Sequence, residues 1–315
     1  MVLQLSTPEH RELKPSLPAC GSIKYVFNFF RRPSRLTLGE LEAALERLGL
    51  DGSQSIIAHS SLRAFGHIEG GAGTVARALR KRVSTLVMPA FSYYTLVWPP
   101  EKCSGDWHEN LPIASGHFDR FSKVSSDIGR LSQYLVDDLR NMRSKHPALS
   151  FVAWGRYAYE VLERQSLENP YGPIGVLLDL DGYILLLGVS HTSNTTLHYG
   201  EYLAGQVLLP RYVMQGGEVR ETYFPNCSGA FDRMAGYLTP VKEVRLERGK
   251  VSLFKIRDVL EATRSVLVGN PEALLCNNSS CRCQEIRHLV RLEGLQPRVH
   301  QAVDVKNARA LVGKR

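Results

Sequence analysis

The chain has 315 residues, 43% hydrophobic and 22% charged, which is typical of a globular protein with a sizeable core. Its formal net charge of +8 favours an anionic partner, such as nucleic acid, a membrane surface or a phosphate-bearing cofactor. No apolar run is long enough to form a transmembrane helix, and the N-terminus lacks a signal-peptide pattern. We therefore expect a cytoplasmic protein without a membrane-spanning segment.

Residues 1–36 contain several prolines and show little periodicity, which predicts an N-terminal extension. A helix is predicted to follow, because Thr37 and Glu40 have the spacing of a capping box. Leucines recur at helical spacing after Thr37, and Gly49 is a typical helix terminator. The short apolar run 54–58 then predicts a strand.

The loop after that strand, residues 59–74, is rich in hydroxyl groups and glycine and precedes an amphipathic helix. A loop between a strand and a helix start is where backbone N–H groups gather and can bind an anion. The loop matches neither a P-loop nor a dinucleotide-binding fingerprint. A tight glycine turn that serves only packing is therefore an open alternative.

Residues 90–123 follow a predicted strand at 84–88 and combine aromatic residues with scattered acids. A loop of this length is more often functional than idle, and its composition suits a polar, ring-shaped or cationic substrate. A flap that merely covers the core is the alternative. After a predicted helix at 128–139, Arg143 and Lys145 form a compact basic turn. Such a turn suits phosphate groups, unless it is simply solvated.

The stretch 183–201 is the most informative part of the chain. Its apolar run 183–187 predicts a buried strand, and a helix start follows that Asn194 or a later threonine can cap. In that helix His198 and Glu201 lie three residues apart on one face. An imidazole beside a carboxylate can act as a general base with its orienting partner. A solvated surface pair is the alternative, and a zinc site would need further ligands.

The remaining chain mixes strand and helix patterns. Alternating runs at 207–214 and 218–223 predict neighbouring strands, and residues 254–267 predict an amphipathic helix. Strands and helices mixed throughout one chain predict a layered α/β domain, which we place at residues 37–275. A cysteine-containing C-terminal tail, 276–315, is predicted after it.

Three of the six cysteines cluster in that tail as Cys276, Cys281 and Cys283. A metal site would need a fourth ligand, such as His288 or Cys227 brought in by the fold. The spacing C-x4-C-x-C is not a standard zinc spacing, so the sequence favours unpaired thiols over a metal ion or a disulfide. No metal site is predicted.

Four segments of the chain resemble the aminoglycoside 3-N-acetyltransferase family, in the family's order. They are HSSLRAFGHIEGGAGTV (59–75), STLVMPAFS (84–92), RSKHPALSFVAWG (143–155) and DGYILLLGVSHTSNTTLHYGE (181–201). Each segment alone is modest, but four in order with family-like spacing are highly specific. The resemblance spans roughly residues 36–231.

The resemblance implies a three-layer α/β/α sandwich and an antibiotic-resistance acyltransferase. Such an enzyme moves an acetyl group from the co-substrate acetyl-CoA to an amine, nominally of an aminoglycoside. His198 matches the family's catalytic histidine, and Glu201 matches the acid of its L-H-x-A-E pattern. The coenzyme site implied by the resemblance has two parts. The first comprises Ser60, Ser61, Leu62, Arg63 and Thr74, and the second comprises Arg143, Ser144 and His146.

The residue chemistry agrees with this resemblance. Acetyl transfer needs a base to take the proton of the attacking ammonium group, and histidine titrates in the right range. Backbone N–H groups or hydroxyls of the polar loop 190–196 are candidates for holding the oxyanion. No cysteine lies within the four segments, which favours direct transfer over an acyl-enzyme.

The chain departs from the family pattern in three respects. Gly200 stands where the family usually has alanine, and the stretch 165–175 lacks a His and a Ser of a segment near the family's acceptor pocket. The chain is also basic, whereas an acidic surface suits polycationic aminoglycosides. An amino sugar of a surface polysaccharide or a biosynthetic amine is therefore an alternative acceptor.

A nucleic-acid-binding protein is the alternative from another class. Such a protein clusters its basic residues on one face with aromatic residues between them, whereas Lys and Arg are spread over this whole chain. We therefore expect acetyl-CoA and a small amine as partners, without nucleic acid or membrane, and leave a homodimer open.

Overall fold

The computed structural model describes residues 35–97, 117–225 and 227–303. Nearly all of the predicted N-terminal extension, the middle of the aromatic-rich loop and the end of the predicted tail lie outside these residues. Within the described part of the chain, no helix has the length and apolarity needed to cross a membrane.

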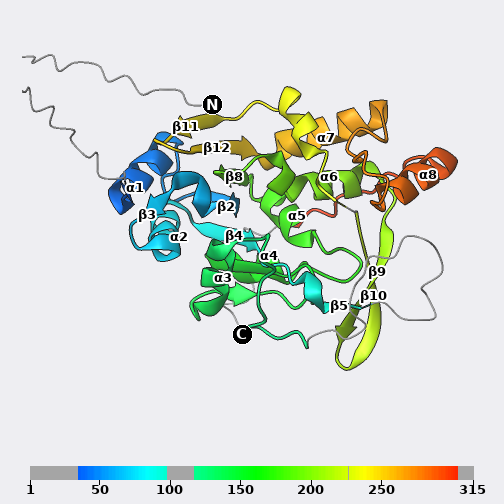
Figure 1. Ribbon diagram of the computed structural model, residues 1–315, viewed down its shortest axis with the longest axis horizontal. Helices are drawn as coiled ribbons and strands as arrows, with labels where there is room; N and C mark the ends of the chain where they lie inside the picture. The colour runs from blue at the N-terminus through cyan, green and yellow to red at the C-terminus, as the bar shows by residue number, and fades with distance from the viewer. Residues whose placement is uncertain (1–34, 98–116, 226, 304–315) are drawn as a thin grey trace, which may run out of the picture. The chain divides into compact units, whose positions relative to one another are not determined.

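A mixed sheet of seven strands forms the centre of the fold (Figure 1). Its strands lie in the order β11 (Lys242–Arg245), β12 (Lys250–Lys255), β8 (Tyr183–Leu187), β2 (Ser55–Ser60), β4 (Thr85–Pro89), β7 (Phe151–Gly155) and β6 (Met142–Arg143). The central strands β8, β2 and β4 are parallel, and each outer strand pairs antiparallel with its inner neighbour. Parallel strands are covered on both faces, and β2 and β4 accordingly consist almost entirely of buried residues.

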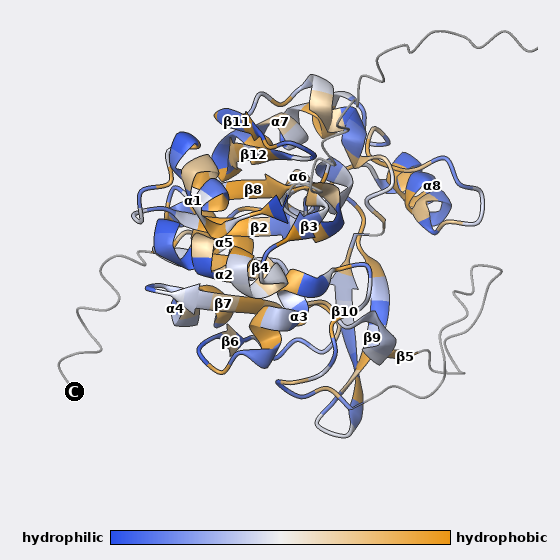
Figure 2. Ribbon diagram, turned by 60° about the vertical axis from the view of Figure 1, so that its left-hand side comes forward, coloured by the Kyte–Doolittle hydropathy of each residue, from blue (hydrophilic) through white to orange (hydrophobic). Residues whose placement is uncertain are grey.

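Helices pack on both faces of this sheet, and hydrophobic residues concentrate along its central strands (Figure 2). In β2, Ile56 and Ala58 belong to one core and Ile57 to the other, because successive side chains point to opposite faces. The first core includes residues of α1 (Leu38–Arg47), α2 (Gly71–Arg82) and α3 (Arg130–Asp137). The second includes residues of α4 (Ala158–Leu162), α5 (Gly172–Asp179), α6 (Thr196–Ala204) and α7 (Ile256–Gly269).

Smaller elements surround these layers. A separate sheet has the strand order β10 (Glu218–Phe224), β9 (Leu209–Gln215) and β5 (Leu96–Val97), and β1 (Arg35–Leu36) pairs with β3 (His67–Ile68). The last helix, α8 (Cys283–Glu293), packs with Leu209 and Leu275 in a third, small core. Short 3-10 helices are η1 (Leu62–Phe65), η2 (Tyr93–Thr95), η4 (His191–Ser193) and η5 (Phe231–Gly236).

The sequence predicted several of these elements correctly. The capping box of α1 is confirmed, because Thr37 Oγ1 accepts from the Glu40 N–H at 3.3 Å while Glu40 Oε2 accepts from the Thr37 N–H at 2.8 Å. The strand at 183–187 is confirmed as β8, and the two predicted neighbouring strands are the antiparallel pair β9 and β10. The helix predicted over 254–267 was partly wrong, because its first two residues end strand β12.

Helices α6 and α7 approach closely at Gly200 and Thr263. A Cβ atom on Gly200 would lie 2.7 Å from Thr263 Cγ2 and 2.8 Å from Thr263 Cβ, which is closer than van der Waals contact allows. Thr263 is fully buried, and its hydroxyl donates to the Val259 carbonyl at 2.6 Å, so it has little freedom to move away. The glycine at the position of the family's usual alanine is therefore a packing requirement of these two helices.

We expect Gly200→Ala to lower the free energy of unfolding by about 1–3 kcal/mol, as overpacking does, even though alanine has the better helix propensity. Gly39→Ala in α1 is the matched control, because a Cβ atom there would meet nothing within 4 Å. Urea unfolding followed by circular dichroism measures both variants. A Gly200→Ala protein as stable as the unchanged chain would contradict the packing argument.

His146 connects the turn after β6 to strand β10 of the second sheet. Its Nδ1 accepts from the Leu149 N–H at 3.0 Å, so Nε2 carries the proton and donates to Thr222 Oγ1 at 3.1 Å. The Thr222 hydroxyl donates in turn to the Leu167 carbonyl at 2.6 Å. The imidazole is buried, and burial lowers its pKa to about 3. Burial also lowers the pKa of His59, in β2, to about 3.

Because of these two histidines, we expect the folded chain to lose stability in mild acid. An unfolded histidine titrates near pH 6.5, so between about pH 6.5 and 3 the unfolded chain binds protons that the folded chain does not. The free energy of unfolding therefore falls as the pH falls, on the order of 1–1.5 kcal/mol per histidine from pH 7.5 to 5.5. Urea unfolding at both pH values measures the loss, and His146→Asn should make it smaller. An equal loss in that variant would show that His146 is not a source of the pH dependence.

Candidate active site

Strands β2 and β8 pair in parallel at the centre of the sheet, with Ser60 opposite Leu187. The chain passes from β2 to β4 on one side and later enters β8 on the other, so the carboxyl ends of β2 and β8 form a topological switch point. The Ser61 N–H donates to the Leu187 carbonyl at 2.9 Å and fixes the loop after β2 against the end of β8. Ligands of open α/β sheets bind at such points. The predicted motifs at 59–75 and 181–201 therefore meet at one edge of the sheet.

Gly188 allows the two loops to approach. Its φ is 70°, and a Cβ atom on it would lie 2.7 Å from both Ala64 Cβ and the Phe65 ring. Glycine adopts this backbone conformation without strain and leaves room for the neighbouring loop. The close contact holds η1 against the start of the loop that leads to α6.

His198 and Glu201 face each other within α6. His198 Nδ1 lies 2.8 Å from Glu201 Oε2, and only 11% and 3% of the two side chains are exposed. This burial excludes the solvated surface pair that the spacing alone left open. Burial raises the pKa of Glu201, and the hydrogen bond with His198 opposes that shift. Because a carboxylate only accepts, Nδ1 carries the proton and Nε2 is left to accept another.

Two aromatic rings hold the imidazole of His198. Tyr171 stacks on it with ring centroids 5.7 Å apart and planes 16° apart, and Phe231 packs at 4.6 Å and 59°. Both rings are buried, so they restrict the rotation of the imidazole and keep water from its faces. Sequence reasoning missed both residues, since only folding brings α5 and η5 to α6. The one available signal was that Tyr171 lies in the segment 165–175, which departs from the family pattern.

Three buried polar atoms near this edge have no hydrogen-bond partner among the described residues. They are His59 Nε2 and Ser60 Oγ at the end of β2, and Thr196 Oγ1 at the start of α6. Buried polar groups are normally paired, so such atoms mark positions that a ligand or a water molecule completes. The N-cap of α6 is Thr195, one of the threonines that the sequence offered, but its side chain makes no capping bond. Asn194, one residue earlier, accepts from the Thr196 N–H through Oδ1 at 3.2 Å.

The first predicted coenzyme segment lies at this same edge. Ser60 ends β2, Ser61 precedes η1, and Leu62 is half-buried in η1. Arg63 is exposed, so its guanidinium can reach an anion from a loop that leads to the start of α2. Thr74 is buried in the first turn of α2.

The second predicted coenzyme segment is turned inward. All five N–H groups of Arg143 donate to protein oxygens, which are Ser150 Oγ, Ser92 Oγ and the carbonyls of Arg120, Ser122 and Ala90. Burial lowers the pKa of Arg143 to about 10. Ser144 Oγ accepts from the Phe151 N–H at 2.8 Å, and His146 is bonded as described above. These three side chains hold the loops around β6 and β7, and Arg143 retains no N–H group for a coenzyme phosphate.

A pocket of about 370 Å³ lies at the C-terminal end of α6. Its lining includes Tyr202, one turn after His198, together with Glu168, Glu293 and Arg298. Another pocket, of about 460 Å³, lies along α7. His198 lines neither of them.

The chain is similar in sequence to known proteins. The family model for aminoglycoside 3-N-acetyltransferase matches residues 57–268. The SPbeta prophage-derived aminoglycoside N(3')-acetyltransferase-like protein YokD of Bacillus subtilis is 31% identical over 171 residues, which are 50% of this chain and 62% of that protein. The chain thus spans less than two thirds of the length of that curated relative. Aminoglycoside N(3)-acetyltransferase IV of a Salmonella species is 30% identical over 247 residues, 74% of this chain and 87% of that protein.

Solved structures share the fold. The apoenzyme of aminoglycoside acetyltransferase AAC(3)-IVa has a TM-score of 0.66 and 26% identity, over 81% of this chain and 98% of that one. AAC-IIIb in its binary complex with CoASH has a TM-score of 0.62 and 25% identity, over 75% and 97%. Since the family match contains both motifs of the β2–β8 edge and covers most of the chain, this protein belongs to the aminoglycoside 3-N-acetyltransferase family.

Proposed function

We propose that the chain is an acetyl-CoA-dependent N-acetyltransferase that transfers the acetyl group directly to an amine of an aminoglycoside. The observation that carries the proposal is the buried His198–Glu201 pair, with its 2.8 Å contact, on the helix that follows β8. The name of the Salmonella relative and the CoASH complex of AAC-IIIb support both substrates. We also infer that the helices on both faces of the central sheet form a three-layer α/β/α sandwich.

His198 is the general base in this proposal. Its Nε2 takes a proton from the attacking amine, whose nitrogen forms the new bond to the acetyl carbon. Glu201 orients the ring through Nδ1 and stabilises the imidazolium that forms, because its buried carboxylate lies beside the developing charge. As the thioester C–S bond breaks, the imidazolium returns the proton to the departing thiolate. The products are the acetylated amine and CoA.

The residues around the pair take supporting roles. Thr196 Oγ1 is our candidate donor to the oxyanion, because it is a buried hydroxyl without a partner among the described residues. The loop from Ser60 to Arg63, with Thr74 at the helix entry, is the proposed contact for the pantetheine and pyrophosphate arm. Arg143, with Ser144 and His146, is proposed to act on the second part of the coenzyme site by shaping its loops.

The pocket at the C-terminal end of α6, which His198 does not line, is our candidate for holding a part of the acceptor away from the reacting amine. Its lining carries two carboxylates, Glu168 and Glu293, and one guanidinium, Arg298, which together suit a cationic acceptor. A hydrogen bond from Ser166 lowers the pKa of Glu168, so this carboxylate is ionised at neutral pH. Amino sugars linked to nucleotides are a second acceptor class, favoured by the net charge of +8.

We expect CoA release from acetyl-CoA in the presence of 2-deoxystreptamine aminoglycosides, measured with a thiol reagent and confirmed by mass spectrometry of the acetylated product. His198→Ala should reduce turnover roughly 10²–10⁴-fold, because it removes the base, while CoA binding by calorimetry is retained. His288→Ala is the matched control, since His288 is exposed on α8. If only nucleotide-linked amino sugars were acetylated, the aminoglycoside would be rejected as the acceptor, while the mechanism of acetyl transfer would stand. Equal turnover by the His198→Ala protein would reject the base assignment.

Glu201→Gln tests the orienting role separately. The amide can donate to Nδ1 and leave the proton on Nε2, so turnover should fall on the order of 10²-fold or more with little change in the KM for acetyl-CoA. Glu261→Gln makes the same change at an exposed position of α7 and should leave turnover unaltered. Steady-state kinetics measures turnover and KM for both variants. Equal values for Glu201→Gln and Glu261→Gln would exclude an orienting role for Glu201.

A further inference from the structure

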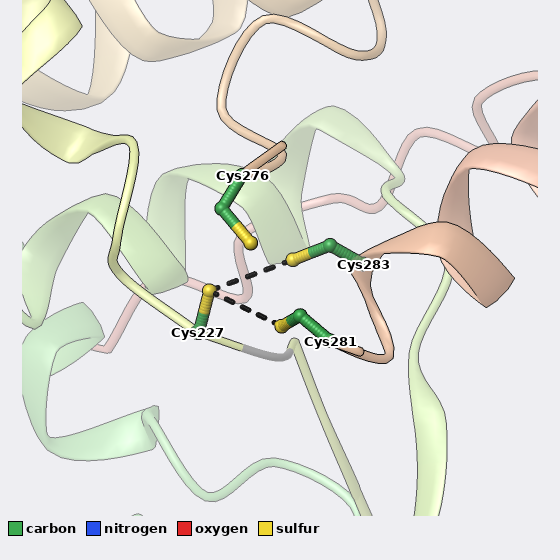
Figure 3. A group of neighbouring side chains, drawn as sticks. All are labelled: Cys227, Cys276, Cys281 and Cys283. Atoms are coloured by element: carbon green, nitrogen blue, oxygen red, sulfur yellow. Dashed lines mark hydrogen bonds between the residues drawn. The ribbon is translucent and has the colours of Figure 1, made fainter. Parts of the chain in front are cut away.

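Four cysteines come together at one point although they lie in three separate segments of the chain. Cys227 precedes η5, Cys276 follows α7, and Cys281 and Cys283 lie at the start of α8. Their sulfur atoms all lie within 4.8 Å of one another, and Figure 3 shows them pointing toward a common centre. The sequence suggested either His288 or Cys227 as a fourth partner, and the fold supplies Cys227. His288 is exposed on α8.

The distances between the sulfur atoms fit a single tetrahedral ion. Four sulfurs at about 2.3 Å from a zinc ion would lie about 3.8 Å from each other. Cys227 Sγ lies 3.5 Å from Cys283 Sγ and 3.6 Å from Cys281 Sγ. A disulfide would require about 2.05 Å, so these contacts are not S–S bonds. A cluster with several iron atoms would need its outer sulfurs farther apart than one ion does.

The surroundings of the sulfurs also fit thiolate ligands. Backbone N–H groups of Gly229 and Cys283 donate toward the sulfurs of Cys227 and Cys281, as outer-shell donors do at metal-bound sulfurs. Cys283 is fully buried beside Leu209, Leu275 and Ile286. A divalent cation deprotonates the thiols that coordinate it.

The loop that carries Cys276 is held in place independently of any ion. Arg287 of α8 donates to the Cys276 carbonyl at 3.1 Å and to Glu272 at 2.9 Å. The Cys281 N–H donates to the Asn278 carbonyl at 3.1 Å. The backbone that carries Cys276 and Cys281 is therefore held by contacts other than an ion.

We propose that Cys227, Cys276, Cys281 and Cys283 form a structural zinc site. Four protein ligands leave no open coordination position, so the ion takes no part in acetyl transfer. It fastens α8 and the loop after α7 to the segment that leads into η5, which carries the Phe231 that packs on His198. The proposal does not depend on the proposed function.

Metal analysis of the full chain, purified without chelator or added metal, tests this site. We expect one zinc per chain by mass spectrometry of metals after exhaustive dialysis. Cys227→Ser and Cys276→Ser should each lose the zinc. A variant with Cys20→Ser and Cys103→Ser, which changes the two cysteines outside the described residues, and the His288→Ala variant should retain it.

Two measurements use the unchanged chain, so they test the proposal even if the cysteine variants fail to fold. Zinc removal with a thiol-reactive mercurial, followed by Co²⁺, should give the thiolate-to-cobalt charge transfer and intense visible bands of a tetrahedral four-thiolate site. A strong chelator should lower the melting temperature, and added zinc should restore it. Purified chain that lacks zinc and takes up neither Zn²⁺ nor Co²⁺ would overturn the proposal. Bound iron in place of zinc would overturn the assignment of the metal.

Discussion

The parallel pairing of β2 with β8 is the constraint on which the rest of the site depends. It sets Ser60 opposite Leu187, so two loops that are far apart in sequence leave the sheet side by side. The backbone groups of the loop after β2 need partners, and the Ser61 N–H finds one on the Leu187 carbonyl. Gly188 then removes the side chain that would keep the loops apart. The geometry of the site is thus a property of the sheet centre rather than of either motif alone.

The buried polar side chains differ in how far protein partners satisfy them. The imidazole of His146 and the guanidinium of Arg143 are saturated by protein partners, so they stabilise loops and offer nothing to a ligand. His198 is bonded at Nδ1 by Glu201, which leaves Nε2 available. A structural histidine therefore differs from a candidate base in how many of its ring nitrogens are hydrogen-bonded within the protein.

The C-terminal part of the described chain is tied to the same layers. His300 Nε2 lies 2.7 Å from Asp179 of α5, and its Nδ1 lies 2.9 Å from the Tyr199 hydroxyl of α6. The cysteine cluster fastens α8 near the strand pair β9 and β10 through the small core around Leu209. Residues 276–303 thus contribute contacts to the helices that carry the candidate site, although the sequence suggested only a tail.

The sequence by itself determined the local features. Capping at Thr37, the buried strand at 183–187 and the His198–Glu201 spacing depend on neighbouring residues, so they could be predicted from short patterns. Strand β12 was missed, because its short alternation runs directly into the periodic pattern of α7. Only the tertiary structure decided the rest: the rings on His198, the saturation of Arg143, the clash that requires Gly200 and the convergence of Cys227 on the C-terminal cysteines. Each of these arises from contacts between segments distant in sequence, whose distances no local pattern encodes.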